Sequence, residues 1–309
     1  MKGYSVRRFP VPLICLIAAG LAGAIALRAS SSTPFRARSV ECPRCPSVLE
    51  PSGIALFRGA PVFASDNDDP VLYRLDEKGG IAIAEPFIKI TLPPDIRRLK
   101  RHALDLEGLA SAGPLLYAVD ERDRLVYRID PEGAAIVVPH DVVDYNRRSG
   151  IVFSHKTNAG FEGIAVDTHK RLVYIANERD DAIVYTLGLS ADGLRLRAMA
   201  HLSMSGLTGD DRFDISDLYF ENGFLFVLYR RAARILKLDP GSRRIVGSFD
   251  AGFAVAGLYH SPGGYCFAEG LYMTRREIFL LLDGGGKTMS GKRGGENGAL
   301  VVLVRPRGF

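Results

Sequence analysis

The feature that most constrains the fold is a short phrase that returns at a nearly constant interval. Glu107-Gly108-Leu109-Ala110 recurs as Glu162-Gly163-Ile164-Ala165 and as Glu269-Gly270-Leu271, and weaker copies are Ser52-Gly53-Ile54-Ala55 and Ser216-Asp217-Leu218. Counted from positions 52, 107, 162, 217 and 269, the steps are 55, 55, 55 and 52 residues. A fixed period of this size predicts a stacked or radial repeat architecture.

Each repeat contains further short runs that are typical of strands. After the second phrase, residues 115–120 and 125–130 are rich in Val, Ile, Leu and Tyr and are bounded by Gly, Asp, Pro or charged residues. A fourth run follows in copies one to four, at residues 81–91, 134–142, 194–202 and 243–250. Four strands joined by short turns predict a β-propeller blade. The chain has no Trp, and this together with its longer period argues against the WD40 type.

The predicted fold is therefore all-β, with one propeller over residues 51–309. The fifth copy reaches Phe309 with only three strands, and Phe35–Val40 is a candidate for the missing one, because propellers often close with a strand from the other terminus. This arrangement gives five blades. Residues 253–259 could instead belong to an irregular sixth blade, so six blades stay open.

The phrase also predicts a cluster of acidic side chains. The first strand of a propeller blade lines the central channel, so the carboxylates that open it converge at one rim. In four copies a second polar residue follows 13 to 15 residues later, which is about the length of two short antiparallel strands and a turn. The residues expected at this rim are Glu107, Glu162, Asp217, Glu269, Asp66, Asp120, Asn177 and Asp283.

Carboxylates that lie this close raise one another's pKa and need compensation. A hard cation such as Ca²⁺ could take their oxygens, some could be protonated and available for acid–base chemistry, or basic side chains of the same turns could neutralise them. Those basic residues are Arg122, Arg179, Arg230 and Arg231. A structural alternative is that Glu-Gly only builds the turn, with the Gly allowing a close backbone approach near the axis.

Several of these segments resemble a known family. Asn158–Ala165, followed by Tyr174–Glu178, is similar to the central motif of the SdiA-regulated β-propeller proteins, and Asp214–Leu218 and Ala268–Leu271 resemble later motifs. The Gly-Phe-Glu-Gly pattern also resembles the phytase-like esterase family. The resemblance runs from about residue 50 to 283.

The resemblance implies an extracytoplasmic propeller able to hold calcium, with Glu107, Glu162 and Glu269 as axial acidic groups. The fourth repeat departs from the family pattern: Tyr229-Arg230-Arg231 stands where the family tends to have Ser-Asp-Glu. This difference counts against metal binding by that blade.

Residues 1–29 read as an export segment. Lys2, Arg7 and Arg8 precede an apolar run from Val11 to Leu27, which fits either a cleaved secretory signal or an uncleaved anchor in the inner membrane. The expected location is therefore the periplasm. The whole chain carries +5 and this segment supplies four of those charges, so the remainder carries only +1. Nucleic-acid binding consequently has no electrostatic basis.

Residues 30–50 form a linker that contains Cys42 and Cys45. A lone Cys-x-x-Cys lacks the second pair that a structural zinc site requires. In an oxidising compartment, one of these cysteines is a candidate to pair with Cys266 and so tie the linker to the last blade.

Three functions remain open from the sequence. The first is a binding propeller with Ca²⁺ in its acidic ring and one rim presented to a small ligand or a protein partner. The second is a metal-assisted hydrolase of phosphate or carboxylic esters, in which the cation would polarise the ester and activate water. No Gly-x-Ser-x-Gly nucleophile motif is present. The third is a purely structural interaction module.

Overall fold

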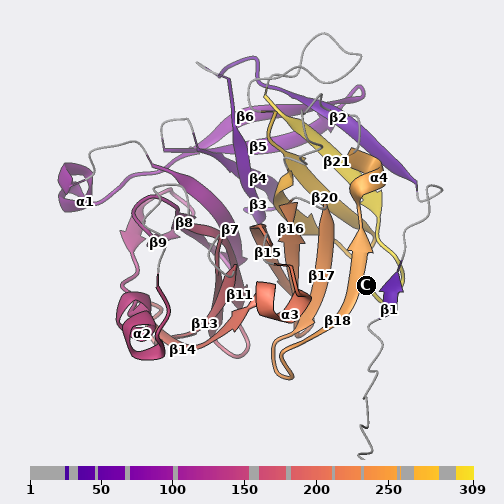
Figure 1. Ribbon diagram of the computed structural model, residues 1–309. Coiled ribbons are helices and arrows are strands. Elements are labelled where there is room, and N and C mark those ends of the chain that lie inside the picture. Colours follow the sequence, from indigo (N-terminus) through magenta and orange to yellow (C-terminus); the bar gives the residue numbers. More distant parts are fainter. Residues whose placement is uncertain are drawn as a thin grey trace, which may run out of the picture.

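Five antiparallel blades surround one axis, and the innermost strand of each blade lies nearest that axis (Figure 1). The predicted five-bladed β-propeller is therefore confirmed. The structure is a computed structural model, and it describes residues 25–27, 34–45, 48–66, 70–99, 104–152, 160–178, 182–210, 213–230, 233–255, 258, 268–284 and 297–309.

The strands of each blade follow one another in sequence from the axis outward. Blades 1 and 2 consist of β3 (Pro51–Phe57), β4 (Ala60–Ser65), β5 (Val71–Lys78), β6 (Ile81–Lys89), β7 (Leu106–Ala112), β8 (Leu115–Asp120), β9 (Leu125–Ile129) and β10 (Ala135–Val137). Blades 3 and 4 consist of β11 (Phe161–Asp167), β12 (Leu172–Asn177), β13 (Ile183–Leu189), β14 (Leu196–Ser203), β15 (Ile215–Glu221), β16 (Phe224–Tyr229), β17 (Arg234–Asp239) and β18 (Arg244–Asp250).

Blade 5 closes the ring with a strand from the other end of the chain. Its own strands are β19 (Ala268–Met273), β20 (Glu277–Leu282) and β21 (Ala299–Val304), and β2 (Phe35–Glu41) pairs antiparallel with β21. This is the segment that the sequence predicts as the closing strand. The last residues of β2 also pair parallel with β6, so β2 joins blade 5 to blade 1. Around the axis, each inner strand contacts the next one, and β19 contacts β3.

Short helices occupy the connections between blades. They are α1 (Pro94–Leu99), α2 (Val142–Ser149), α3 (Met204–Thr208) and α4 (Gly252–Val255). The last of these lies where the sequence left an irregular sixth blade open, and the described residues there form a helical turn rather than a strand.

The hydrophobic core lies between neighbouring blades rather than within one. Ala55 and Ile88 of blade 1 pack with Leu109 and Tyr127 of blade 2, and equivalent clusters fill the other four interfaces. Strands of this kind bury both faces, which explains their continuous Val, Ile and Leu runs. The radial arrangement therefore depends on apolar contacts that each blade makes with both neighbours.

Every inner strand carries a β-bulge at the repeated phrase. In blade 2, Leu106 lies opposite Asp120 and Leu109 lies opposite Ala118, so three steps on β7 match two steps on β8. The same one-residue shift occurs in the other four blades. Bulges redirect side chains, and here they set which residue of each phrase faces the mouth of the channel.

The glycine of the phrase lies against the backbone of the next blade. A Cβ placed on Gly108 would approach the carbonyl oxygen of Glu162 to 2.6 Å, and one on Gly163 would approach the Cα of Asp217 to 2.9 Å. Gly53 and Gly270 make the same kind of approach. At these four contacts the inner strands can lie this close only because the residue has no side chain.

Most of the N-terminal segment for which the sequence predicts an export signal or anchor lies outside the described residues. Within residues 1–29, only β1 (Ile25–Leu27) is described, and it pairs parallel with residues 247–249 of β18. None of the helices in the described ranges has the length and apolar character needed to span a membrane. Cys42 and Cys45 form a disulfide with each other. The expected pairing of one of them with Cys266 is therefore wrong, and Cys266 itself lies outside the described residues.

Candidate functional site

An acidic pocket opens at the mouth of the channel where the inner strands begin. Its volume is about 270 Å³, and its described lining includes eight carboxylic acids and one basic side chain. The ionisable residues are Glu50, Asp66, Glu107, Glu121, Glu162, Glu178, Glu269, Asp283 and Arg230. We call this cavity the acidic mouth.

Two positions in each blade supply most of these side chains. The first is the opening residue of the phrase, which is Glu107, Glu162 and Glu269 in blades 2, 3 and 5, and Ser52 in blade 1. The second is the residue that directly follows the second strand. From blade 1 to blade 5 it is Asp66, Glu121, Glu178, Arg230 and Asp283. The bulge and the hairpin together bring these two positions to the same mouth.

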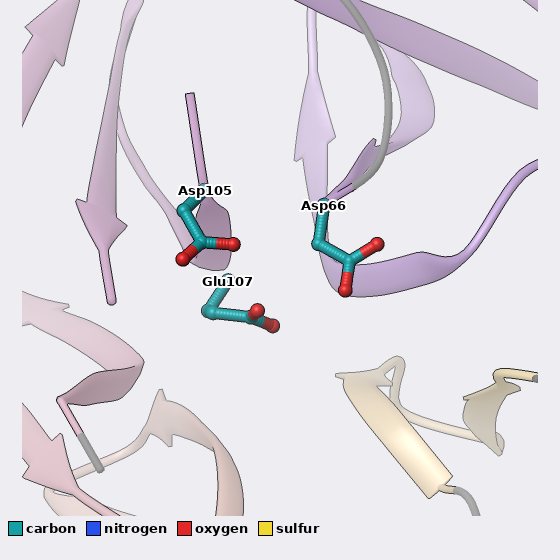
Figure 2. Close-up of side chains that lie close together, drawn as sticks. All are labelled: Asp66, Asp105 and Glu107. Atoms are coloured by element: carbon teal, nitrogen blue, oxygen red, sulfur yellow. The ribbon is translucent and has the colours of Figure 1, made fainter. Parts of the chain in front are cut away.

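Three carboxyl groups from blades 1 and 2 come together at one half of the acidic mouth; two of them, Asp66 and Glu107, line the cavity, and Asp105 is not part of its described lining. Figure 2 shows Asp66, Asp105 and Glu107 turned toward a shared space, with Asp66 at the end of β4 and the other two at the start of β7. One carboxylate oxygen from each lies within 4.8 Å of the others. Oδ1 of Asp66 is buried and has no hydrogen-bond donor among the described residues. Arg122 Nε lies 3.3 Å from Asp105 at the outer side of this group.

The other half contains a second group of three acids and an arginine. Glu121, Glu162 and Glu178 also place one oxygen each within 4.8 Å of one another, and all three are buried. Arg230, which follows β16, extends into this half from blade 4. It replaces the acidic residue that the other blades have at the equivalent position.

Arg230 is saturated by carboxylates. Its Nη1 donates to both oxygens of Glu269 at 2.9 Å, its Nη2 donates to Asp214 at 3.0 Å, and its Nη2 also donates to Glu178. Burial opposes the charge of this guanidinium, but Glu269, Glu162 and the other nearby carboxylates more than offset that effect and raise its pKa. Arg230 therefore supplies the counter-charge for Glu178, Asp214 and Glu269 in this half of the acidic mouth.

The pKa values of the acids reflect this imbalance. Burial, together with the charges of Glu50, Asp283 and Asp105, raises the pKa of Asp66 to about 8. Burial and the neighbouring Asp66 and Glu269 raise the pKa of Glu107 well above its ordinary value. In the absence of a bound cation, part of this cluster is therefore protonated near neutral pH.

The structure divides the residues predicted for this rim into two sets. Five of them line the acidic mouth: Glu107, Glu162, Glu269, Asp66 and Asp283. The other three, Asp217, Asp120 and Asn177, are buried and are not part of its lining.

Asp217 lies at the axis and not at the mouth. It occupies the position that is glycine in the other four phrases, because the bulge aligns Ser216 with Glu107 and Glu162. Its Oδ1 accepts from the N–H of Leu218 at 2.8 Å, and its Oδ2 accepts from the N–H of Leu271 at 2.7 Å. Burial raises the pKa of Asp217, and these two hydrogen bonds oppose that rise.

Asp120 and Asn177 each precede by one residue in the sequence the side chain that lines the acidic mouth. They are the last residues of β8 and β12, and Glu121 and Glu178 after them reach the pocket. Asp120 instead accepts from the backbone N–H of Asp123 at 2.9 Å, which closes the turn between β8 and β9. A constant spacing of 14 residues, counted from Ser52, Glu107, Ser216 and Glu269, identifies the residue that follows the second strand in those four blades. These residues are Asp66, Glu121, Arg230 and Asp283.

The lining chemistry favours a cation over a covalent mechanism. The described lining offers carboxylate oxygens, and the one hydroxyl there, Ser52 Oγ, donates to the carbonyl of Leu106 at 2.6 Å. Carboxylate and other oxygen ligands are those that Ca²⁺ prefers. The hydroxyl of Ser52 donates to a backbone carbonyl, whereas an activated nucleophile would donate to a basic side chain.

Solved structures similar to this chain are also propellers or propeller-like. Glutaminyl cyclase from Myxococcus xanthus superposes with a TM-score of 0.54 at 15% identity, covering 87% of this chain and 94% of that one. The PQQ-bound aldose sugar dehydrogenase from Streptomyces coelicolor gives a TM-score of 0.44 at 14% identity, covering 88% and 99%. At this identity the first similarity supports the fold alone. No curated protein sequence matches the chain.

The family model described as SdiA-regulated matches residues 96–271. This span is more than half of the 309 residues. It covers blades 2 to 4, the start of blade 5 and four of the phrases that line the axis. The chain therefore belongs to the SdiA-regulated family.

Proposed function

We propose that the protein is an extracytoplasmic binding propeller that holds a divalent cation, Ca²⁺, at its acidic mouth and presents that rim to a ligand or partner. The observation that carries the proposal is the excess of negative charge. Eight carboxylic acids share a pocket of about 270 Å³ with one arginine in the described lining. A group of this kind needs a cation or protons to remain together.

The Asp66, Asp105 and Glu107 half is the proposed position of the ion. Its three oxygens already lie within 4.8 Å of one another, and the buried Oδ1 of Asp66 offers an acceptor. Ca²⁺ takes six to eight oxygens at about 2.3–2.6 Å, so Glu50, Asp283 and water would complete the shell. In the other half, the guanidinium of Arg230 already meets Glu178, Asp214 and Glu269.

The charge of the site disfavours a phosphate-ester substrate. One Ca²⁺ and Arg230 together supply three positive charges, against eight acids in the described lining. Protonation of Asp66 and Glu107 would reduce the negative charge without reversing it, so the mouth would still repel a phosphate dianion. A cationic or neutral ligand suits the rim better than an anionic one.

The proposed location follows from the composition of residues 1–29, which combine a basic start with an apolar run. Extracellular and periplasmic compartments also permit the disulfide between Cys42 and Cys45. Calcium at high micromolar to millimolar levels is characteristic of sites in extracellular modules. These points support an exported protein, soluble or anchored by that segment.

A calcium titration of the full chain tests the proposal. The protein is first freed of metal with a chelator, and its melting temperature and heat of binding are then measured against Ca²⁺ and Mg²⁺. A free ion concentration of one hundred times Kd would add about 2.7 kcal/mol to the stability of the folded state.

Glu107→Gln is expected to weaken Ca²⁺ binding at least tenfold, because it removes one charged ligand. The matched control is Glu85→Gln, since Glu85 pairs with Arg74 at 2.8 Å outside the acidic mouth. The proposal is wrong if Ca²⁺ leaves the melting temperature unchanged, or if both variants bind it equally well. Parallel assays with nitrophenyl acetate and nitrophenyl phosphate would reveal hydrolysis.

A further inference from the structure

A second pocket lies at the other end of the same five strands. Its volume is about 300 Å³, and all five inner strands contribute to it, with residues that close the phrase or follow it rather than with the residue that opens it. It shares no lining residue with the acidic mouth. We call this cavity the aromatic mouth.

The aromatic mouth is chemically the opposite of the acidic one. Its described lining contains no charged side chain. Blades 1 to 3 contribute small residues, among them Ala55, Ala110 and Ala165. At the equivalent positions, blades 4 and 5 contribute Tyr219 and Tyr272. At this position three blades carry a methyl group and two carry a large ring. We call the space on the alanine side the slot and the two rings the aromatic wall.

The aromatic wall is held in place by its neighbours. The rings of Tyr219 and Tyr272 meet edge to face, with centroids 5.9 Å apart, and Tyr272 also packs on Phe279 at 5.5 Å. The hydroxyl of Tyr219 donates to the carbonyl of Met273 at 2.8 Å. Both tyrosines are only partly buried, so the wall is fixed in orientation while still open to a ligand.

The unpaired edges of the inner strands are a further source of polar groups for this pocket. Each inner strand is the last strand of its sheet at the axis, so one of its edges makes no strand pairing. N–H and C=O groups on such an edge can bond a ligand where no neighbouring side chain uses them; the carbonyls of Leu56 and Met273 already accept from Ser111 and Tyr219. The side-chain hydroxyl of Ser111 is already used, because it donates to the carbonyl of Leu56.

From these features we infer that the aromatic mouth is a second binding site, for an uncharged small molecule with a flat aromatic ring. Small-molecule sites are concave, mostly apolar, and carry a few polar groups that fix orientation, and their volumes begin at about 300 Å³. Stacked or edge-to-face contacts with Tyr219 and Tyr272 would add to the burial of the ring. A charged ligand would lose its hydration here without gaining an ion pair.

Indole is a suitable probe because the chain contains no Trp, so indole fluorescence can be followed against tyrosine alone. We expect saturable binding of indole to the full-length protein. Tyr272→Ala should weaken it at least tenfold by removing part of the wall. Ser111→Phe should weaken it similarly by filling the slot from the opposite side. The melting temperature of each variant shows whether it is folded. If Tyr272→Ala does not fold, indole binding by Ser111→Phe is the deciding measurement.

Two controls separate this site from others. Met199→Ala should leave indole binding unchanged, since Met199 is 62% exposed on the outer strand β14. Glu107→Gln and added Ca²⁺ should also leave it unchanged, whether or not the acidic mouth binds calcium. The inference is overturned if indole binding does not saturate, if the folded wall and slot variants bind as well as the native protein, or if Glu107→Gln abolishes binding.

Discussion

Replacing Arg230 by Gln should destabilise the protein strongly, because this side chain is the main counter-charge in one half of the acidic mouth. Its side chain is 19% exposed, and its guanidinium meets Glu178, Asp214 and Glu269. The side chain of Gln is shorter and uncharged and has only two N–H donors, so it cannot donate to all three carboxylates or neutralise them. The remaining acids would then repel one another in a partly buried site.

The size of the effect follows from the burial of the group. Removing one partner of a buried ion pair costs about 3–5 kcal/mol. For a domain of this size, a change of 1 kcal/mol shifts the melting temperature by about 2–4 °C. We therefore expect a loss of about 10 °C in the metal-free protein, measured by differential scanning calorimetry at pH 7.

Calcium should restore part of this loss if the proposed site is correct. The variant has one fewer resident cation, so the rise in melting temperature with Ca²⁺ should be larger than in the native protein. Arg147→Gln is the control, because Arg147 is 77% exposed and its ion pair with Asp144 contributes less than about 1 kcal/mol. A native-like melting temperature for Arg230→Gln would refute the assignment of Arg230 as the internal counter-ion.

Two further predictions follow from the phrase and its acids. Gly108→Ala should cost about 1–3 kcal/mol in denaturant unfolding, because its Cβ would meet backbone atoms of blade 3 at 2.6 Å, whereas Gly247→Ala meets nothing closer than 3.7 Å and should be nearly neutral. The metal-free protein should lose stability as the pH rises from about 4 to 8. The pKa of Asp66 is raised from 3.8 to about 8 in the folded state, so its stabilising contribution is complete below pH 4 and is lost through pH 8. A melting temperature that rises with pH over this range would contradict the second prediction, and saturating Ca²⁺ should flatten the slope because the ion competes with those protons.

The five-bladed fold was predictable because its cause is repeated in the sequence. Each blade must bury both faces against its neighbours, so each repeat carries the same apolar runs, and the deficit of one strand in the fifth repeat indicated the closing strand. The acidic mouth was predictable only as a region. A bulge adds one residue to each inner strand, and periodicity alone does not show where the extra residue lies.

Local geometry explains the remaining differences. In blade 3, the spacing from the residue that opens the phrase to the residue that follows the second strand is longer than in the other blades. Glu178, and not Asn177, therefore lines the acidic mouth. The pairing of Cys42 with Cys45 depends on a tight turn, in which the N–H of Cys45 donates to the carbonyl of Cys42 at 3.3 Å. The spacing of the cysteines in the sequence could not distinguish a disulfide within this turn from a disulfide to Cys266.

Asp217 allows the structural role of the axis to be separated from ion binding at the mouth. The sequence predicts Asp217 in the acidic ring. In the structure its carboxylate is buried and accepts hydrogen bonds from the backbone N–H groups of Leu218 and Leu271. Asp217→Gly restores the residue of the other four phrases and leaves those two donors without this acceptor. Buried donors without a partner cost about 1–3 kcal/mol each. We therefore expect a clear loss in denaturant stability with a calcium Kd changed less than twofold. A tenfold weaker Kd at unchanged stability would instead place Asp217 among the ligands and invalidate the separation between mouth and axis.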